Sequence, residues 1–385
     1  MTDLTSSRSP VRAIPGDENR RPQPGIALCL SGGGYRAMVF HLGALWRLNE
    51  LGFLPKLARI SSVSGGSLTA GMLGLKWSRL QFDPSTGVSP RYVNEVVAPV
   101  RALASTTIDE GDALKGLFLP GTVAERIADS YRRYLFGTAT LQDLPDIPSF
   151  VINATSVQTG SLWRFAKPYM ADWQVGLVKS PTIELAVAVG ASSAFPPVLS
   201  PVRLTLDPND FEKDSGSGLQ SPPYTTNVVL TDGGVYDNLG LETAWKNYDT
   251  ILVSDAGAHM APDPTPHTDW ARLALRVNDM IDNQVSDLRQ RQLIDSYVSG
   301  DRKGTYWAAR SNIGNYPATE TLACPFEATQ KLAAVPTRLA ALDDLTQQRL
   351  INWAYAICDA AMRSHVVTTV AAPSAFPYPA AGVGA

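Results

Sequence analysis

The stretch SGGGYRA, residues 31–37, decides the fold class of this 385-residue chain. A short apolar run of strand character, residues 26–30, precedes it, and apolar residues at helical spacing follow it, at Met38, Leu42 and Leu45. A strand that stops at glycine and continues as a helix is typical of α/β proteins, which carry their functional residues at the carboxyl ends of strands. This turn is therefore a candidate corner of an active site.

Two further corners of the same kind lie downstream. SVSGGS, residues 62–67, follows an apolar run at residues 57–60, and TDGG, residues 231–234, follows another at residues 227–230. The three corners offer backbone N–H groups, a hydroxyl and a carboxylate. These are the parts that acyl transfer needs: an oxyanion hole, a nucleophile and a base.

The glycine run supplies the N–H groups. Without side chains, Gly32, Gly33 and Gly34 allow a sharp turn with unpaired N–H groups at a helix N-terminus, where an oxyanion or a phosphate binds. Arg36 adds a positive charge just inside the helix. The same letters fit the dinucleotide fingerprint G-x-G-x-x-A, but that interpretation needs an acidic residue at the end of the next strand, where this chain has serines.

Ser64 occupies the nucleophile position of a strand-to-helix elbow, with the small residues Ser62 and Gly66 two positions to either side. The pattern S-x-S-G-G is looser than G-x-S-x-G, and a serine-glycine turn taken alone is more often structural. The glycine corner upstream favours the catalytic interpretation.

Asp232 is the candidate base. A free aspartate is a weak base at neutral pH, so it must gain basicity from burial or act through strict positioning. The competing interpretation is an ordinary Asx turn, for which Asp-Gly is a common pattern. The chain has only four histidines, and His259 alone is a candidate for a triad in the order Ser64, Asp232, His259.

Composition is that of a globular protein with a large core, since 44% of the residues are hydrophobic and 18% are charged. A net charge of −3 favours binding neither to nucleic acid nor to an anionic membrane by bulk electrostatics. The three cysteines are scattered, without metal-binding spacing, which is typical of a reducing compartment. We expect a cytoplasmic protein without a bound metal, a cofactor or a membrane-spanning helix.

One domain is expected over residues 25–365, between a disordered leader at residues 1–24 and a flexible tail at residues 366–385. Strands alternate with helices in the motif-bearing part, residues 25–257, which predicts an α/β fold with a mainly parallel central sheet flanked by helices. The part that follows, residues 258–365, is expected to be helical, with long helices at residues 269–298 and 344–364.

The combined motifs resemble those of the patatin-like phospholipases, a family related in fold to the catalytic domain of cytosolic phospholipase A2. The matching residues are Gly32, Gly33 and Gly34 with Arg36 for the oxyanion loop, Ser64 for the nucleophile and Asp232 for the base. GASSAFPPV, residues 190–198, and NATSVQTG, residues 153–160, look like two further family blocks. The resemblance covers residues 25–257, and it departs from the family pattern at Ser62, where most members have glycine.

The resemblance implies a three-layer patatin-like fold and a serine lipid acyl hydrolase of the phospholipase A type. Ser64 would attack the ester carbonyl while Asp232 takes its proton, without histidine, metal or cofactor. The N–H groups of the glycine loop and of Gly65 would hold the oxyanion, and Arg36 would lie near the substrate phosphate. The substrate would be a phospholipid or another acyl ester, met at a membrane or micelle surface by a protein in peripheral contact with it.

Two alternatives stay open. One is a water-soluble carboxylesterase that uses the triad of Ser64, Asp232 and His259, and the other is a non-catalytic lipid-binding protein on the same fold.

The apolar segment ALKGLFLP, residues 113–120, bears on how lipid reaches the site. This segment suits either a buried turn or a glycine-hinged lid that contacts lipid.

Overall fold

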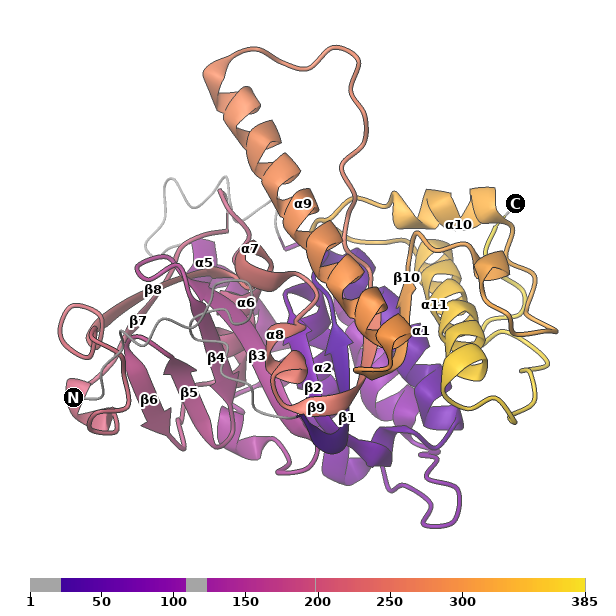
Figure 1. Cartoon of the computed structure of the whole chain (residues 1–385), viewed down its shortest axis with the longest axis horizontal. Coiled ribbons are helices and arrows are strands. Elements are labelled where there is room, and N and C mark those ends of the chain that lie inside the picture. The colour runs from indigo at the N-terminus through magenta and orange to yellow at the C-terminus, as the bar shows by residue number, and fades with distance from the viewer. Residues whose placement is uncertain (1–21, 109–122, 198, 385) are drawn as a thin grey trace.

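A computed structural model describes residues 22–108, 123–197 and 199–384, and it shows a ten-stranded sheet between two layers of helices (Figure 1). The expected three-layer α/β fold class is confirmed. Most of the predicted leader and the whole of the predicted lid at residues 113–120 lie outside the described residues.

The strands that carry the three corners form a parallel run. In sheet order this run is β10 (Lys303–Ala308), β9 (Tyr248–Asp255), β1 (Gln23–Leu30), β2 (Leu57–Val63) and β3 (Ser149–Ser156). Antiparallel strands extend the sheet beyond β3: β4 (Leu162–Ala166), β5 (Tyr169–Asp172) and β6 (Gly176–Lys179), with β8 (Asn227–Asp232) joining β3 to β7 (Val202–Thr205).

The second half of β1, from Ile26 to Leu30, is an apolar run, and its residues from Ala27 onward are buried on both faces of the sheet. Successive side chains of a strand point to opposite faces. Leu28 and Leu30 accordingly join the large core on one side of the sheet, and Ala27 and Cys29 join a smaller core on the other.

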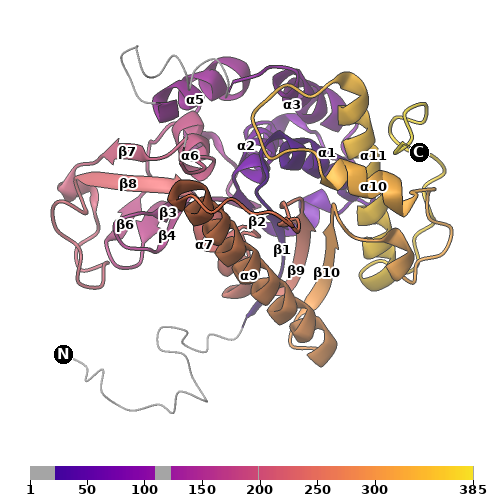
Figure 2. The same ribbon diagram turned by 90° about the horizontal axis from the view of Figure 1, so that it is seen from above.

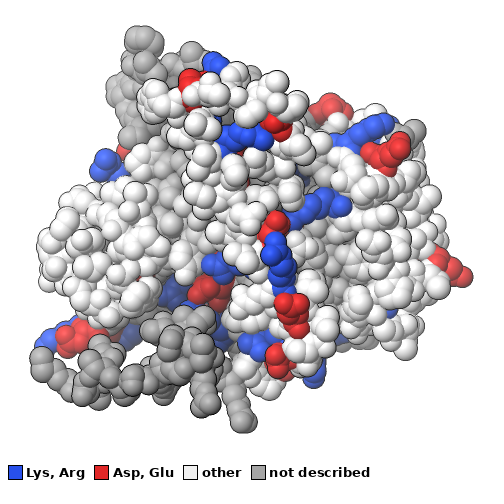
Figure 3. Space-filling model, turned by 45° about the horizontal axis from the view of Figure 1, so that its top comes forward, with Lys and Arg blue, Asp and Glu red and all other residues white. Residues whose placement is uncertain are grey.

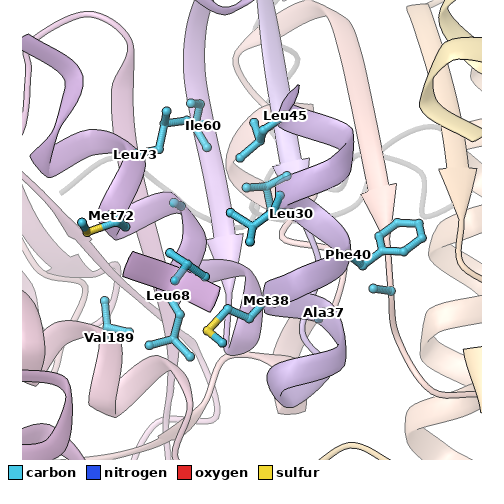
Figure 4. Packing of buried hydrophobic residues seen from close by; sticks show 14 of the residues in the cluster. Leu30, Ala37, Met38, Phe40, Leu45, Ile60, Leu68, Met72, Leu73 and Val189 are labelled. Carbon is cyan, nitrogen blue, oxygen red and sulfur yellow. The ribbon is translucent and has the colours of Figure 1, made fainter. Parts of the chain in front are cut away.

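The large core lies under α1 (Gly34–Glu50) and α2 (Gly65–Leu75), which start at the glycine corner and the serine corner (Figure 4). α1 is buried on nearly all sides because it lies between the sheet and α11 (Asp344–His365). The same core includes side chains of α3 (Ala98–Ala104), α5 (Val123–Tyr131), α6 (Leu185–Ser192) and α10 (Phe326–Ala333).

The other face of the sheet is covered by α7 (Gly234–Asp237), α8 (Glu242–Trp245) and α9 (Trp270–Ser299) (Figures 1 and 2). α9 packs through its C-terminal part, where Leu293 is fully buried, whereas its N-terminal end projects from the body (Figure 1). α9 and α11 confirm the two long helices predicted from the sequence.

Short helical turns complete the chain, and none of them was predicted as a separate element. They are η1 (Leu54–Lys56), η2 (Trp77–Arg79), η3 (Val93–Val97), η4 (Arg132–Phe136), η5 (Leu141–Asp143), η6 (Pro208–Asp210) and η7 (Ile313–Asn315). η4 continues directly from α5, so the two together form one helical segment from Val123 to Phe136.

Residues 366–384 differ from the flexible tail expected there. They contain no helix or strand, but they pack against α11, where the Asn352 amide donates to the carbonyls of Tyr378 and Gly382 at 2.8 and 2.7 Å. Val383 is buried. Asn352, in the middle of α11, thus holds this segment in place. The composition of residues 366–384 alone does not predict these contacts.

On the face shown in Figure 3, charges of the two signs are mixed. Figure 3 shows Lys and Arg interspersed with Asp and Glu on the face in view, without a large area of one sign. Within the described ranges, no helix has both the length and the apolar character that crossing a bilayer requires. The three cysteines are buried free thiols.

Candidate active site

The site lies where β2 and β8 end, because the last residues of these two strands pair with neighbouring residues of β3. Val63, the last residue of β2, pairs with Asn153 of β3, and Asp232, the last residue of β8, pairs with the next residue, Ala154. Because Asn153 and Ala154 both also pair with β4, β2 and β8 must lie on the same edge of β3. The residue that follows β2 is Ser64, so the register of β3 places the serine opposite the aspartate.

Ser64 sits in a strained turn between β2 and α2. Its backbone has φ 52° and ψ −121°, a conformation that residues with a Cβ rarely adopt and that a nucleophile elbow uses. The glycines after it are required by close packing. A Cβ on Gly65 would lie 2.1 Å from the carbonyl oxygen of Gly34, and one on Gly66 would lie 2.5 Å from that of Leu30.

Asp232 is buried, with 2% of its surface exposed. Its Oδ1 accepts a hydrogen bond from the Gly234 N–H at 2.7 Å, whereas Oδ2 is buried without a hydrogen-bond partner in the part of the chain that the structure describes. Burial, with a smaller contribution from the charge of Asp282, raises the pKa of Asp232 to about 7 against the opposing effects of the Gly234 N–H and the Ser64 hydroxyl. A carboxyl group with this pKa can both accept and release a proton near neutral pH.

Ser192 links the serine to the aspartate, and the sequence reasoning did not assign it a role. Its hydroxyl accepts a hydrogen bond from the Ser64 N–H at 2.9 Å and lies 2.9 Å from the Ser67 hydroxyl. Its carbonyl accepts one from the Gly233 N–H at 3.2 Å. The block GASSAFPPV contained Ser192, but nothing in its spacing indicated contact with two strand ends far away in the sequence.

Ser62, where glycine was expected, causes no conflict. Its hydroxyl accepts a hydrogen bond from the Ser67 hydroxyl at 3.0 Å and contacts the Val151 carbonyl at 3.4 Å. The position lies inside β2 rather than in the turn, so a small polar side chain fits.

The glycine loop faces the serine elbow. Gly33 and Gly34 have φ of 139° and 59° and line the cavity described below. Gly34 and Gly65 begin α1 and α2, where an N–H has no partner within the helix. None of the hydrogen bonds among the described residues uses the N–H of Gly33, Gly34 or Gly65. The Gly32 N–H, in contrast, donates to the Asn238 carbonyl at 3.1 Å and is already occupied.

Arg36 does not face the cavity, contrary to the expectation that it lies near a substrate phosphate. It is 2% exposed, and its guanidinium donates to the Ala256 carbonyl from Nε and Nη2 at 3.1 and 2.8 Å and to the Val335 carbonyl at 2.5 Å. Burial lowers the pKa of Arg36 to about 10. A Cβ on Gly33 would lie 3.0 Å from Nη2, so the arginine supports the back of the glycine loop.

His41 and His259 lie in different surroundings. His41 is buried, with its two ring nitrogens 2.9 Å from the Ser31 carbonyl and from the Ser254 hydroxyl, and burial lowers its pKa to about 4. It is therefore a neutral structural residue. His259 is exposed and lines the cavity, and its Nδ1 lies 3.2 Å from the Met260 carbonyl. Among the described residues, no hydrogen bond joins it to Ser64 or Asp232.

A cavity of about 560 Å³ opens over the two candidate catalytic residues. Part of its lining is apolar and comes from Phe195, Pro196, Pro197 and Leu199 together with Met260 and Leu339, and another part is the polar face of α9. Among the described residues, no group of three His, Cys, Asp or Glu side chains is placed to hold a metal ion. Ser64, Asp232, Gly33 and Gly34 all line the cavity, which therefore offers a hydroxyl, a carboxylate and N–H groups that have no partner among the described residues.

This geometry defines an α/β protein with an elbow serine that faces a strand-end aspartate. A family model described as patatin-like phospholipase matches residues 28–245, which is more than half of the chain. The chain belongs to the patatin-like phospholipase family. No curated protein sequence matches it.

Solved structures show distant similarity. Human GIVD cytosolic phospholipase A2 is 13% identical, with a TM-score of 0.49 over 88% of this chain and 59% of that one. VipD from Legionella pneumophila is 17% identical, with a TM-score of 0.35 over 89% of this chain and 67% of that one. The chain thus spans less than two thirds of the phospholipase structure, and scores below 0.5 support no inference about its activity.

Proposed function

We propose that the chain is a serine lipid acyl hydrolase that cleaves carboxylic esters of phospholipids through a dyad of Ser64 and Asp232. One observation carries the proposal: the register of β3 sets the strained elbow of Ser64 against a buried carboxylate whose Oδ2 has no other partner among the described residues. Family membership and the raised pKa of Asp232 add support.

In the first half of the reaction, Ser64 Oγ attacks the ester carbonyl carbon and its proton passes to Asp232 Oδ2. The negative charge that develops on the carbonyl oxygen is held by the N–H groups of Gly33, Gly34 and Gly65. The tetrahedral intermediate then collapses, the ester C–O bond breaks, and Asp232 returns the proton to the leaving alcohol. The acyl group remains on Ser64.

In the second half, Asp232 takes a proton from water, and the hydroxide formed attacks the acyl carbonyl in the same oxyanion hole. Collapse expels Ser64 Oγ, which regains the proton from Asp232, and the fatty acid leaves. A carboxylate with a pKa of about 7 both accepts and returns a proton at neutral pH, which suits this double role.

The cavity is suited to a substrate with one apolar and one polar part. Its volume of about 560 Å³ lies in the range of ligand-binding pockets, and Phe195, Pro196 and Leu199 supply the apolar wall. We infer that the acyl chain lies along that wall.

A cytoplasmic location of the protein remains a prediction.

The first alternative, a triad esterase, depends on His259. This residue lines the cavity without a hydrogen bond to Asp232 among the described residues, so a triad would require its side chain to move onto Asp232, whereas the dyad does not use it. A non-catalytic lipid-binding protein needs neither Ser64 nor Asp232. The unpaired Oδ2 of Asp232 has no role in such a protein.

Hydrolysis of a panel of phospholipids and of short monomeric acyl esters tests the proposal, with Ser64→Ala measured beside the wild type. We expect fatty acid release from at least one phospholipid and complete loss of release in the variant. Activity that is confined to monomeric esters would favour the esterase, and binding of phospholipid without any hydrolysis would favour the non-catalytic protein.

A further inference from the structure

α9 exposes the side that a surface helix normally buries. In most amphipathic helices the apolar stripe faces the core and the polar side faces solvent. Here an apolar stripe along the helix is open to solvent: Trp270, Leu273, Val277, Met280, Ile281 and Leu288, of which Trp270 is 84% exposed and Ile281 56%.

The polar side of the same helix is turned to the cavity. Asp279, Asp282, Asn283 and Ser286 line it, at the spacing of one helix face. At 100° per residue, the centre of this set lies nearly opposite the stripe of Trp270, Val277 and Ile281. α9 therefore forms a wall with the active-site cavity on one side and an uncovered apolar surface on the other.

We propose that this apolar stripe of α9 docks on a lipid surface with phosphate head groups, which brings the mouth of the cavity to the membrane that supplies the substrate. The proposal rests on the proposed function, because it takes lipid as the substrate. An amphipathic helix lying in an interface buries its apolar face about 5–10 Å into the boundary between head groups and acyl chains. The projection of the N-terminal half of α9 from the body leaves it accessible for such contact (Figure 1).

Two arginines at the projecting end can reach a phosphate-bearing surface, although each also has an aspartate near it. Arg272 and Arg276 lie there, and the ion pairs that they form with Asp269 and Asp263 are long, at 3.8 and 4.0 Å. The side chain of Arg272 is 64% exposed. Such arginines extend along apolar surface and place their guanidinium groups among lipid phosphates.

Trp270 points to the same partner. Tryptophan is enriched at the boundary between membrane and water, where its apolar ring is buried while its N–H stays hydrated. A second copy of the chain would have to offer a matching apolar surface to the whole stripe, and it would cover the flank of the cavity with protein rather than with substrate.

Flotation with vesicles tests the proposal in the full-length Ser64→Ala protein, which cannot degrade them. We expect binding to phosphatidylcholine vesicles that contain phosphatidylglycerol, and a fall of about tenfold or more in the partition coefficient when Val277→Gln and Ile281→Gln are added. Both side chains are exposed, so thermal unfolding should be unchanged. The matched control replaces Val370 and Ile147 with Gln. These are exposed residues of the same types outside α9, and this variant should bind the vesicles as strongly as the protein without the substitutions.

The outcomes separate the docking proposal from the proposed function. Equal vesicle binding with and without the α9 substitutions would overturn the docking proposal, as would the absence of vesicle binding. A dimer in light scattering that becomes a monomer in the Val277→Gln, Ile281→Gln variant, without vesicle binding, would assign the stripe to a second copy. With Ser64 present, the same variant should keep its hydrolysis of monomeric esters, and absence of hydrolysis in the wild type would contradict the function while leaving the flotation result intact.

Discussion

The Ser192 hydroxyl accepts a hydrogen bond from the Ser64 N–H at 2.9 Å, while the Ser192 carbonyl accepts one from the Gly233 N–H. One residue at the end of α6 thus holds both the elbow and the turn that follows Asp232. The strained φ of 52° at Ser64 needs such support, because a turn in that conformation persists only where its surroundings fix it.

Ser192→Ala should therefore weaken catalysis more than stability. A misplacement of catalytic groups by about 1 Å can cost ~100-fold in rate, so we expect a loss of roughly tenfold or more in kcat on a monomeric ester, with little change in KM. Ser296→Ala, at a buried serine on α9, is the matched control and should keep full kcat. An equal loss in the two variants, or none in Ser192→Ala, would argue against the positioning role.

The activity should rise with pH. Asp232 has to be deprotonated in the free enzyme to act as a base, and its pKa is raised to about 7 by burial, so kcat/KM should increase through an inflection near pH 7. Asp282→Asn removes a negative charge that raises this pKa, and the inflection should move to lower pH. Asp295→Asn, at an exposed position on the same helix, should leave it in place. An inflection that Asp282→Asn does not move would contradict the assignment to Asp232.

Asp232 should lower the stability of the native protein at alkaline pH. Its pKa rises from 3.8 in an unfolded chain to about 7 in the folded one, so its contribution to stability is present below pH 4 and is lost as the pH rises through 7. Asp232→Asn removes the buried charge and should raise the free energy of unfolding at pH 8 by up to roughly 4 kcal/mol. Urea unfolding at pH 8 and pH 5 measures the effect, which should shrink at pH 5. A gain that is larger at pH 5 would reverse the predicted sign.

Arg36 should prove structural. Arg36→Ala removes charge-assisted hydrogen bonds to the Ala256 and Val335 carbonyls, which should lower the free energy of unfolding by roughly 3 kcal/mol. Because the guanidinium does not reach the cavity, hydrolysis of phospholipids and of neutral short esters should fall by the same factor. A loss confined to phospholipids would restore the contact with a substrate phosphate that the sequence suggested.

The motif-bearing strands and helices were predictable because each has a local pattern. β1 and α1 follow from an apolar run, a glycine turn and helical spacing, and both are nearly as expected. β4 to β7 were missed because they are only four or five residues long, and their pairing depends on neighbours rather than on an apolar run.

The site was predictable only in part, because some of its features have a local sequence pattern and others depend on contacts between distant segments. Ser64 and Asp232 stand out by their glycine turns, and the structure brings them together. The contacts of Ser192, the burial of Arg36 and the polar wall from Asp282 depend on the register of distant strands and on the path of α9, which no local pattern encodes.

The rate of covalent labelling by a fluorophosphonate tests the dyad most directly, because the reagent reports the nucleophilicity of the serine without needing the natural substrate. We expect one label, on Ser64 by peptide mapping, at similar rates in the wild type and in His259→Ala, and a rate at least about 100-fold lower in folded Asp232→Asn. Labelling that is lost in folded His259→Ala but kept in Asp232→Asn would contradict the Ser64–Asp232 dyad.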